Sequence, residues 1–188
     1  MPVQIVFETH STTEDNEAGR ATGWLPGRLS PVGRAQAAEL GRRRASDGLA
    51  AIFSSDLARS LETARIAFAG SVPILADWRL RECDYGRLNG APVAEVLTDR
   101  SSHLDEPYPG GESWRQATAR VARFLFDLPL RWEGCRVLVL GHVATYWGLE
   151  CAMNAAELTS LVQGGFDWQK GCEFSFNDGA DQDPRVGD

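Results

Sequence analysis

Short apolar runs of strand length recur along the chain and alternate with segments whose apolar residues recur every three or four positions. The short runs predict strands at 3–10, 50–54, 72–76 and 135–142, with a last, edge strand at 172–176. The helical patterns predict helices at about 30–44, 55–69, 91–99, 113–128, 143–153 and 155–163. This alternation favours an α/β fold: a three-layer α/β/α sandwich whose central, mostly parallel sheet carries helices on both faces.

The first two long helices have recognisable starts. Ser30 suits the N-cap and Pro31 the first helical position, where the amide would be unpaired anyway. The second helix is expected to take Ser55 or Asp56 as its N-cap. The residues expected to pack on the core are Val32, Ala35, Ala38 and Leu40 in the first helix, and Leu57, Leu61 and Ala64 in the second.

Length and charge narrow the protein class. The 188 residues suit one domain, at 1–176, followed by an acidic tail at 177–188 that is expected to be disordered. A formal net charge of −7 argues against nucleic-acid binding and acidic membranes, because these partners need a basic face. The three arginines at 42–44 therefore serve to complement the dipole at the end of their helix.

The cysteines and the ends of the chain bear on location. The four cysteines form no C-x-x-C pair, which indicates reduced thiols in a cytoplasmic protein and no zinc site. No signal peptide and no run long enough to span a membrane is recognisable. The sequence leaves the oligomeric state open, a homodimer included.

Two histidines, His10 and His142, stand at the carboxyl ends of predicted strands. Sites in open α/β sheets form where strands end, although a purely structural histidine is the plainer interpretation of either one alone. Arg59 lies in the first turn of its helix, where a cation is disfavoured unless an anion binds there; a solvated surface arginine is the alternative. His103 is expected to be a surface loop residue.

Together these residues have the chemistry of phosphoryl transfer. An imidazole nitrogen can attack phosphorus and hold it covalently. Arg59 and the second histidine can offset charge on the equatorial oxygens, and Glu82 can protonate the leaving oxygen. We find no G-x-S-x-G, P-loop, H-E-x-x-H or G-x-G-x-x-G motif that would favour another enzyme class.

The chain resembles the histidine phosphatase superfamily, whose fold the cofactor-dependent phosphoglycerate mutases share, over nearly its whole length. Six segments stand in family order: T-H-S-T-T-E-D-N in place of R-H-G-E-x-x-x-N, then R-A-T-G-W with L-S-P-V-G-R-A-Q-A, S-S-D-L-A-R-S-L-E-T-A, L-R-E-C-D-Y-G-R-L-N-G, P-G-G-E-S and G-H-V. Each segment alone is weak evidence, and six in order favour the fold strongly.

The resemblance implies roles for residues of this chain. His10 would be the nucleophile, Arg59 and His142 would clamp the phosphoryl group, and Glu82 would be the general acid and then the base. No metal or organic cofactor is implied. The residues expected to contact phosphate or substrate are Thr9, Ser11, Asn16, Arg20, Thr22, Gly23, Asp84, Tyr85 and Val143.

The first motif departs from the family pattern. Thr9 stands where the family has an arginine, and Ser11 replaces its glycine. Loss of one charged donor at such a site costs roughly 3–4 kcal/mol of transition-state stabilisation, by analogy with a deleted oxyanion donor. Arg20 or Arg28, in the adjacent loop, is a candidate substitute.

The sequence therefore predicts a phosphatase that hydrolyses a small phosphomonoester through phosphohistidine. A mutase is less favoured because the segment from Glu82 to Pro109 is short, and a poorly enclosed intermediate is open to water. The alternative is a catalytically impaired or repurposed member that binds a phosphorylated or anionic ligand or a protein partner, as Thr9 and Ser11 suggest.

Overall fold

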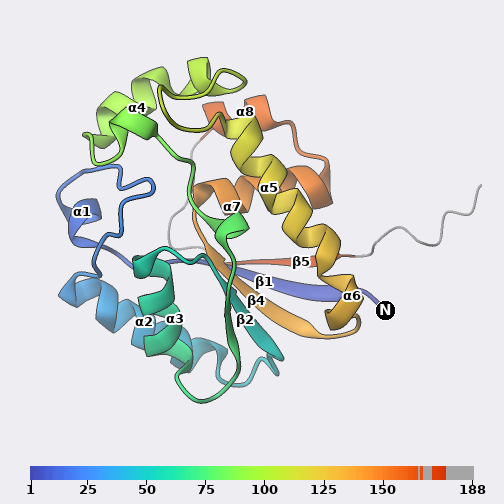
Figure 1. Cartoon of the computed structure of the whole chain (residues 1–188). Helices are drawn as coiled ribbons and strands as arrows, with labels where there is room; N and C mark the ends of the chain where they lie inside the picture. The colour runs from blue at the N-terminus through green and yellow to red at the C-terminus, as the bar shows by residue number, and fades with distance from the viewer. Residues whose placement is uncertain (165, 167–170, 177–188) are drawn as a thin grey trace, which may run out of the picture.

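The computed structural model describes residues 1–164, 166 and 171–176, and the tail predicted at 177–188 lies outside them. The described strands form one sheet in the order β3-β2-β4-β1-β5 (Figure 1). Four of them run parallel, and β5 pairs antiparallel with β1 at the edge. The predicted mostly parallel sheet and its edge strand are confirmed. The strands are β1 (Val3–Thr9), β2 (Ala51–Ser54), β3 (Ile74–Ala76), β4 (Arg136–Gly141) and β5 (Cys172–Phe176).

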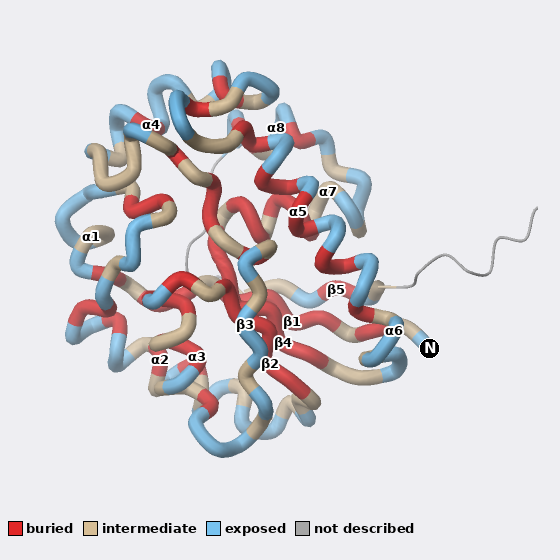
Figure 2. Tube along the Cα trace, viewed as in Figure 1, coloured by how far each residue is buried: buried red, intermediate tan, exposed pale blue. Residues whose placement is uncertain are grey.

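Helices cover both faces of this sheet (Figure 1). On one face α2 and α3 pack through Leu40 and Ala64 against Val6 and Ile52. On the other, α5 and α7 cover the side that includes Phe7. The three central strands, β2, β4 and β1, are almost entirely buried, whereas most residues of the edge strands β3 and β5 are not (Figure 2). The helices are α1 (Glu14–Glu17), α2 (Pro31–Arg44), α3 (Ala58–Phe68), α4 (Val93–Asp99), α5 (Trp114–Asp127), α6 (Pro129–Trp132), α7 (Val143–Asn154) and α8 (Leu158–Gln163), with short 3-10 helices η1 (Trp78–Leu80), η2 (Gly86–Leu88) and η3 (Arg100–His103).

Strand register brings the two predicted histidines together. Thr9 of β1 pairs with Gly141 of β4, so the strands end at the same level and the next residues, His10 and His142, are neighbours. Gly141 is needed here because a Cβ on it would lie 2.3 Å from the Oγ1 of Thr145. The glycine thus permits close packing of α7, and its φ is not in the left-handed region.

The predicted packing face of α2 is wrong at Val32 and Ala35, which are exposed, while Ala38 is half-buried and Leu40 is buried. Val32 is 56% exposed, and the buried residues are Gly33, Ala37 and Leu40. A Cβ on Gly33 would lie 1.9 Å from the backbone oxygen of Thr12, so this glycine sets how closely the helix approaches. Gly33, which is not among the residues that the pattern predicts to pack, therefore lies at the centre of the packing face.

Two further expectations need correction. Leu57, and neither Ser55 nor Asp56, is the N-cap of α3, because the helix starts at Ala58; Leu57 has no capping side chain, and the Oγ of Ser55 accepts from the Leu57 amide just before the helix. His103 is buried, with its ring stacked on Tyr108 at 3.8 Å between centroids, and it contacts Asp99.

The arginines that end α2 have a specific partner. Arg43 and Arg44 both donate to the carboxylate of Glu8, which is only 4% exposed in β1. These ion pairs fix the end of α2 against the sheet, in addition to the expected helix-dipole effect. None of the described helices is both long and apolar enough to cross a membrane.

Candidate active site

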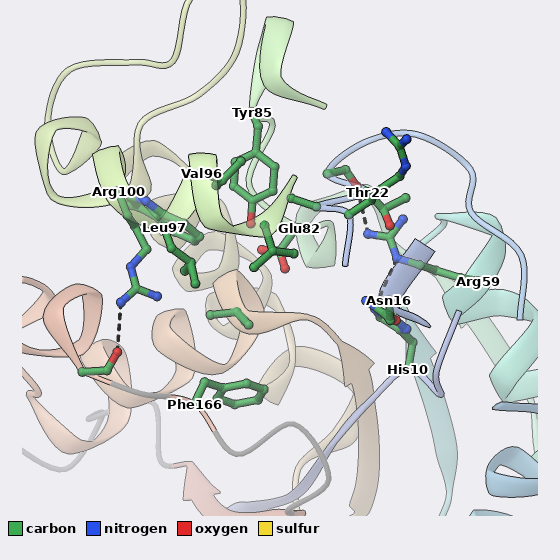
Figure 3. A pocket seen from close by; sticks show the side chains of 17 residues that line it. His10, Asn16, Thr22, Arg59, Glu82, Tyr85, Val96, Leu97, Arg100 and Phe166 are labelled. Carbon is green, nitrogen blue, oxygen red and sulfur yellow. Dashed lines mark hydrogen bonds between the residues drawn. The ribbon is translucent and has the colours of Figure 1, made fainter. Parts of the chain in front are cut away.

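A cavity of about 430 Å³ opens where β1 and β4 end. It brings together residues that are far apart in the chain, from the loop after β1, the start of α3, the segment after η1 and the start of α7 (Figure 3). Of the residues predicted from the sequence, those that line it are His10, Asn16, Arg20, Thr22, Gly23, Arg59, Glu82, Tyr85 and Val143.

His10 is held in one tautomer. Its Nδ1 lies 2.8 Å from the backbone oxygen of Ser11, and because a carbonyl only accepts, Nδ1 carries the proton. The Nε2 lone pair therefore remains on the other side of the ring, where the Nε of Arg59 donates to it at 3.2 Å. Burial, followed by the charge of Arg59, holds the pKa of His10 well below its usual value. The ring is therefore neutral near pH 7, the protonation state in which an imidazole nitrogen can act as a nucleophile.

Arg59 is almost fully buried and is held by uncharged groups. Its Nη1 donates to the backbone oxygen of Leu25 at 2.9 Å and its Nη2 to that of Gly23 at 2.8 Å. Burial lowers its pKa to about 10, against the opposing effects of Glu82, Tyr85 and Asp15. With this pKa Arg59 remains charged at neutral pH. Because the side chain is buried, it is not the solvated surface arginine that was the alternative.

Gly23 provides one of these carbonyls because no other residue fits there. Its φ is +54°, and a Cβ would lie 1.8 Å from the Oδ1 of Asn89. The left-handed backbone lets the loop turn so that its carbonyl oxygens meet the guanidinium.

His142 is the second imidazole, with its ring centroid 4.9 Å from that of His10. Its Nδ1 lies 3.3 Å from Nη2 of Arg59, which can only donate, so the proton is on Nε2. That Nε2 is buried and has no hydrogen-bond partner among the described residues. Burial, then Arg59 and His10, lower the pKa of His142. A buried donor without a protein partner is suited to an oxygen of an anion.

Glu82 has one occupied oxygen. Its Oε1 accepts from the backbone amides of Cys83 at 2.8 Å and Ala144 at 3.1 Å. Within the described part of the chain, Oε2 has no hydrogen-bond partner. Burial raises the pKa of Glu82, and these amides and Arg59 only partly oppose it. A raised pKa keeps a proton available for a leaving group, as a general acid requires.

The loop that holds Arg59 is connected to the segment that carries Glu82. The indole nitrogen of Trp24 donates to the backbone oxygen of Glu82 at 2.6 Å. Arg120 of α5 donates to the same oxygen at 2.7 Å and to that of Arg81 at 2.7 Å. Trp24 and Arg120 thus fix the backbone from which the acid projects.

Other predicted contact residues lie outside the lining of this cavity. Thr9 and Ser11 line a separate cavity of about 130 Å³, which His10 also borders. Asp84 accepts hydrogen bonds from Gly86 and Asn89 and so stabilises a turn. Arg28, one of the two proposed substitutes for the family arginine, is exposed and does not line the main cavity.

Sequence reasoning missed several lining residues. These are apolar or distal side chains, Val93, Val96, Leu97, Arg100, Trp114 and Phe166. The helical spacing of 93, 96 and 97 could have revealed one apolar face, but nothing in the pattern shows that this face borders the site. No cluster of three or more His, Cys, Asp or Glu suited to a metal ion occurs among residues 1–164, 166 and 171–176.

Comparison with known proteins identifies similar chains. The family model described as histidine phosphatase superfamily (branch 1) matches residues 5–180. Phosphoserine phosphatase 1 of Hydrogenobacter thermophilus is 30% identical over 180 residues, or 91% of this chain and 82% of that protein. The 2,3-bisphosphoglycerate-dependent phosphoglycerate mutase of Parvibaculum lavamentivorans is 32% identical over 158 residues, or 76% of this chain and 75% of the mutase.

The fold has close counterparts among solved structures. That of mycobacterial glucosyl-3-phosphoglycerate phosphatase in complex with VO3 has a TM-score of 0.79 and 23% identity, covering 91% of this chain and 90% of that one. This likeness shows a shared fold.

Proposed function

Since the chain belongs to the histidine phosphatase superfamily, we propose that it hydrolyses a small phosphomonoester through a phosphohistidine on His10. The relative that aligns with 91% of this chain is named a phosphoserine phosphatase, and this supports hydrolysis over the mutase reaction of another relative. The observation that carries the proposal is the neutral His10, whose Nε2 lone pair faces the buried cation of Arg59 in the cavity that also holds Glu82.

In the first step the Nε2 lone pair of His10 attacks phosphorus. The N–P bond forms as the bond from phosphorus to the ester oxygen breaks, and that oxygen takes a proton from Oε2 of Glu82. Arg59 and the Nε2–H of His142 donate to the equatorial oxygens, where negative charge is concentrated.

In the second step Glu82, now a carboxylate, takes a proton from water while the water oxygen attacks phosphorus. The P–N bond breaks, inorganic phosphate forms, and both His10 and Glu82 return to their starting protonation states. Charge balances over the two steps because one proton leaves Glu82 and one returns.

The charge of the cavity fits this substrate. Among the described residues that line it are three cations, Arg20, Arg59 and Arg100, and one acid, Glu82. The cavity therefore attracts anions although the whole chain carries a formal net charge of −7.

Arg20 is our candidate for replacing the guanidinium that the family pattern places at Thr9. It lines the cavity, and its Nη1 donates to the backbone oxygen of Gly90 at the surface. Arg20→Ala should weaken inhibition by inorganic phosphate about 10- to 100-fold, because a charge-assisted hydrogen bond is worth about 1.5–3 kcal/mol. The matched control is Arg28→Ala; equal inhibition constants for both variants and the parent protein would exclude this role.

The proposed reaction is tested by phosphohistidine trapping. We expect phenyl phosphate to label the protein with one phosphoryl group that survives alkali and is lost in acid, and His10→Gln to abolish both labelling and turnover. His103→Gln is the control, since that histidine lies outside the cavity lining. Turnover that persists in His10→Gln would disprove the assignment.

Our proposal also includes a cytoplasmic location and a possible homodimer. A cytoplasmic location agrees with Cys83, Cys135 and Cys151, which are present as thiols. A homodimer can be tested by light scattering of the purified protein across a range of concentrations.

A further inference from the structure

The cavity has two chemically different sides. Beside His10 and Arg59 it is polar and cationic. Across from them lie Val96 and Leu97 of α4 together with Phe166 (Figure 3), and the lining also includes Val93 of α4 and Trp114.

This apolar side is partly exposed to solvent, unlike a wall made only of core residues. Val96 is 3% exposed and packs into the cluster with Tyr108 and Trp114, but Leu97, one residue later, is 51% exposed. Val93 shares the face of Leu97 because it lies one helical turn earlier. When a ligand removes the surface of such apolar side chains from water, the free energy of the complex falls, so binding is favoured.

Arg100 connects the two parts of this wall. Its Nη2 donates to the backbone oxygen of Gly164 at 2.9 Å, two residues before Phe166, and its guanidinium lies 5.4 Å from the centre of the Trp147 ring. The side chain of Phe166 in turn lies against Tyr146, with centroids 5.1 Å apart. The wall is therefore held together by contacts from several elements.

We infer that the preferred substrate is a phosphomonoester of an apolar alcohol, with its phosphate at His10 and its hydrocarbon body against Val93, Leu97 and Phe166. This inference rests on the proposed phosphatase function. A compact zwitterion such as phosphoserine fits the wall poorly. Its ammonium group would find only Glu82 as an acid among the described lining residues, and Glu82 is needed for the leaving oxygen.

The test is a series of straight-chain alkyl phosphates from ethyl to hexyl. Their alcohols leave with similar acidity, so kcat/KM reports mainly how well the chain is bound in the transition state. We expect kcat/KM to rise with each methylene, by up to about fourfold where the group is fully buried. Phosphoserine should be hydrolysed less efficiently than butyl phosphate.

A pair of variants tests whether the preference for longer alkyl chains depends on Leu97 or on exposed apolar side chains in general. Leu97→Asn should reduce the ratio of the hexyl to the ethyl phosphate kcat/KM about tenfold. Val32→Asn is the matched control, because Val32 is similarly exposed, at 56%, on α2 and does not line the cavity. The control should leave that ratio unchanged.

The outcomes distinguish this inference from the proposed function. A series that is flat or falls with chain length, combined with His10-dependent turnover of phosphoserine, overturns the apolar preference and leaves the phosphatase intact. An unchanged ratio in Leu97→Asn also overturns it. No His10-dependent turnover of any ester in the series overturns both.

Discussion

Two arginines are each 2% exposed, and they differ in what surrounds them. Arg120 of α5 donates from Nε and Nη2 to the two carboxylate oxygens of Glu112, at 2.9 and 2.8 Å. Arg59 of α3 donates to carbonyl oxygens and imidazole nitrogens, all of them neutral. One cation is neutralised where it stands, and the other is not.

The difference separates an arginine that stabilises the fold from one that we propose binds the substrate anion. The bidentate pair leaves Arg120 little charge to offer a ligand, and its remaining bonds hold the backbone from Arg79 to Glu82. Arg59 keeps its charge in a desolvated site, at the cost of a lowered pKa. An anion in the cavity would supply the missing countercharge, as the proposed binding of phosphate requires.

The largest effect should follow from breaking the neutralised pair. Arg120→Met leaves Glu112 without its cation and the backbone oxygens of Arg79 and Arg81 without this donor, so the free energy of unfolding should fall by about 3–5 kcal/mol. Urea denaturation measures this. Arg123→Met is the control on the same helix, where the side chain is exposed.

The double variant Arg120→Met, Glu112→Leu sharpens this test. It removes both charges, so it should recover part of the lost stability if the unpaired carboxylate is the main penalty. A loss below about 1 kcal/mol in Arg120→Met would contradict the structural role.

Arg59→Met should show the opposite pattern. We expect kcat/KM to fall about 100- to 1000-fold, the effect of deleting one donor to a developing anion. The free energy of unfolding should change by no more than about 1 kcal/mol, because a poorly compensated buried charge is removed with its bonds.

Arg65→Met, in the last turn of the same helix, provides the baseline for both measurements. A stability loss in Arg59→Met as large as that of Arg120→Met would remove the distinction between the two arginines.

The sequence indicated one of these arginines and not the other. Arg59 stood out because a cation in the first turn of a helix calls for an anion, and that argument is local. Arg120 lies inside an amphipathic helix, and its carbonyl partners come from the end of η1 and the two residues after it, 79–82, whose path no periodicity predicts. The strands and their alternation were predictable because period and length are visible in the sequence itself.

The site was predictable only in part, for the same reason. His10 and His142 could be paired because parallel strands end at one edge of a sheet. The apolar wall of α4, the packing face of α2 around Gly33, and the contact of Trp24 with Glu82 depend on tertiary approach. No sequence motif predicts those tertiary contacts.

The pH dependence of kcat tests how Arg59 acts on its neighbours. The lowered pKa of His10 keeps the nucleophile neutral as the pH falls below 6.5, and the raised pKa of Glu82 keeps the acid protonated above 4.5. The parent protein should therefore be most active on the acidic side of neutrality, with activity lost below the pKa of His10 and above that of Glu82.

Removing Arg59 should move both limits in one direction. Its charge lowers the pKa of His10 and that of Glu82, so in Arg59→Met both limbs of the kcat profile shift to higher pH. Arg65→Met should leave the profile where it is. NMR titration of the His10 ring checks the acid limb directly, and an unshifted His10 would show that Arg59 does not influence the nucleophile.

The smallest expected effect is at Trp24, which links the two regions. Its indole nitrogen donates to the backbone oxygen of Glu82 that Arg120 also reaches, and the carbonyls on either side of it, from Gly23 and Leu25, hold Arg59. Trp24→Phe removes one hydrogen bond worth about 0.5–1.5 kcal/mol, so kcat should fall about two- to tenfold.

Two further measurements distinguish positioning from stability in Trp24→Phe. The lost bond positions both Glu82 and the loop whose carbonyl oxygens hold Arg59. The alkaline limb of the kcat profile should therefore shift, and inhibition by phosphate should weaken at the same time. A purely structural loss would lower stability and leave both properties unchanged. Trp78→Phe, at a tryptophan that is 50% exposed, should change neither.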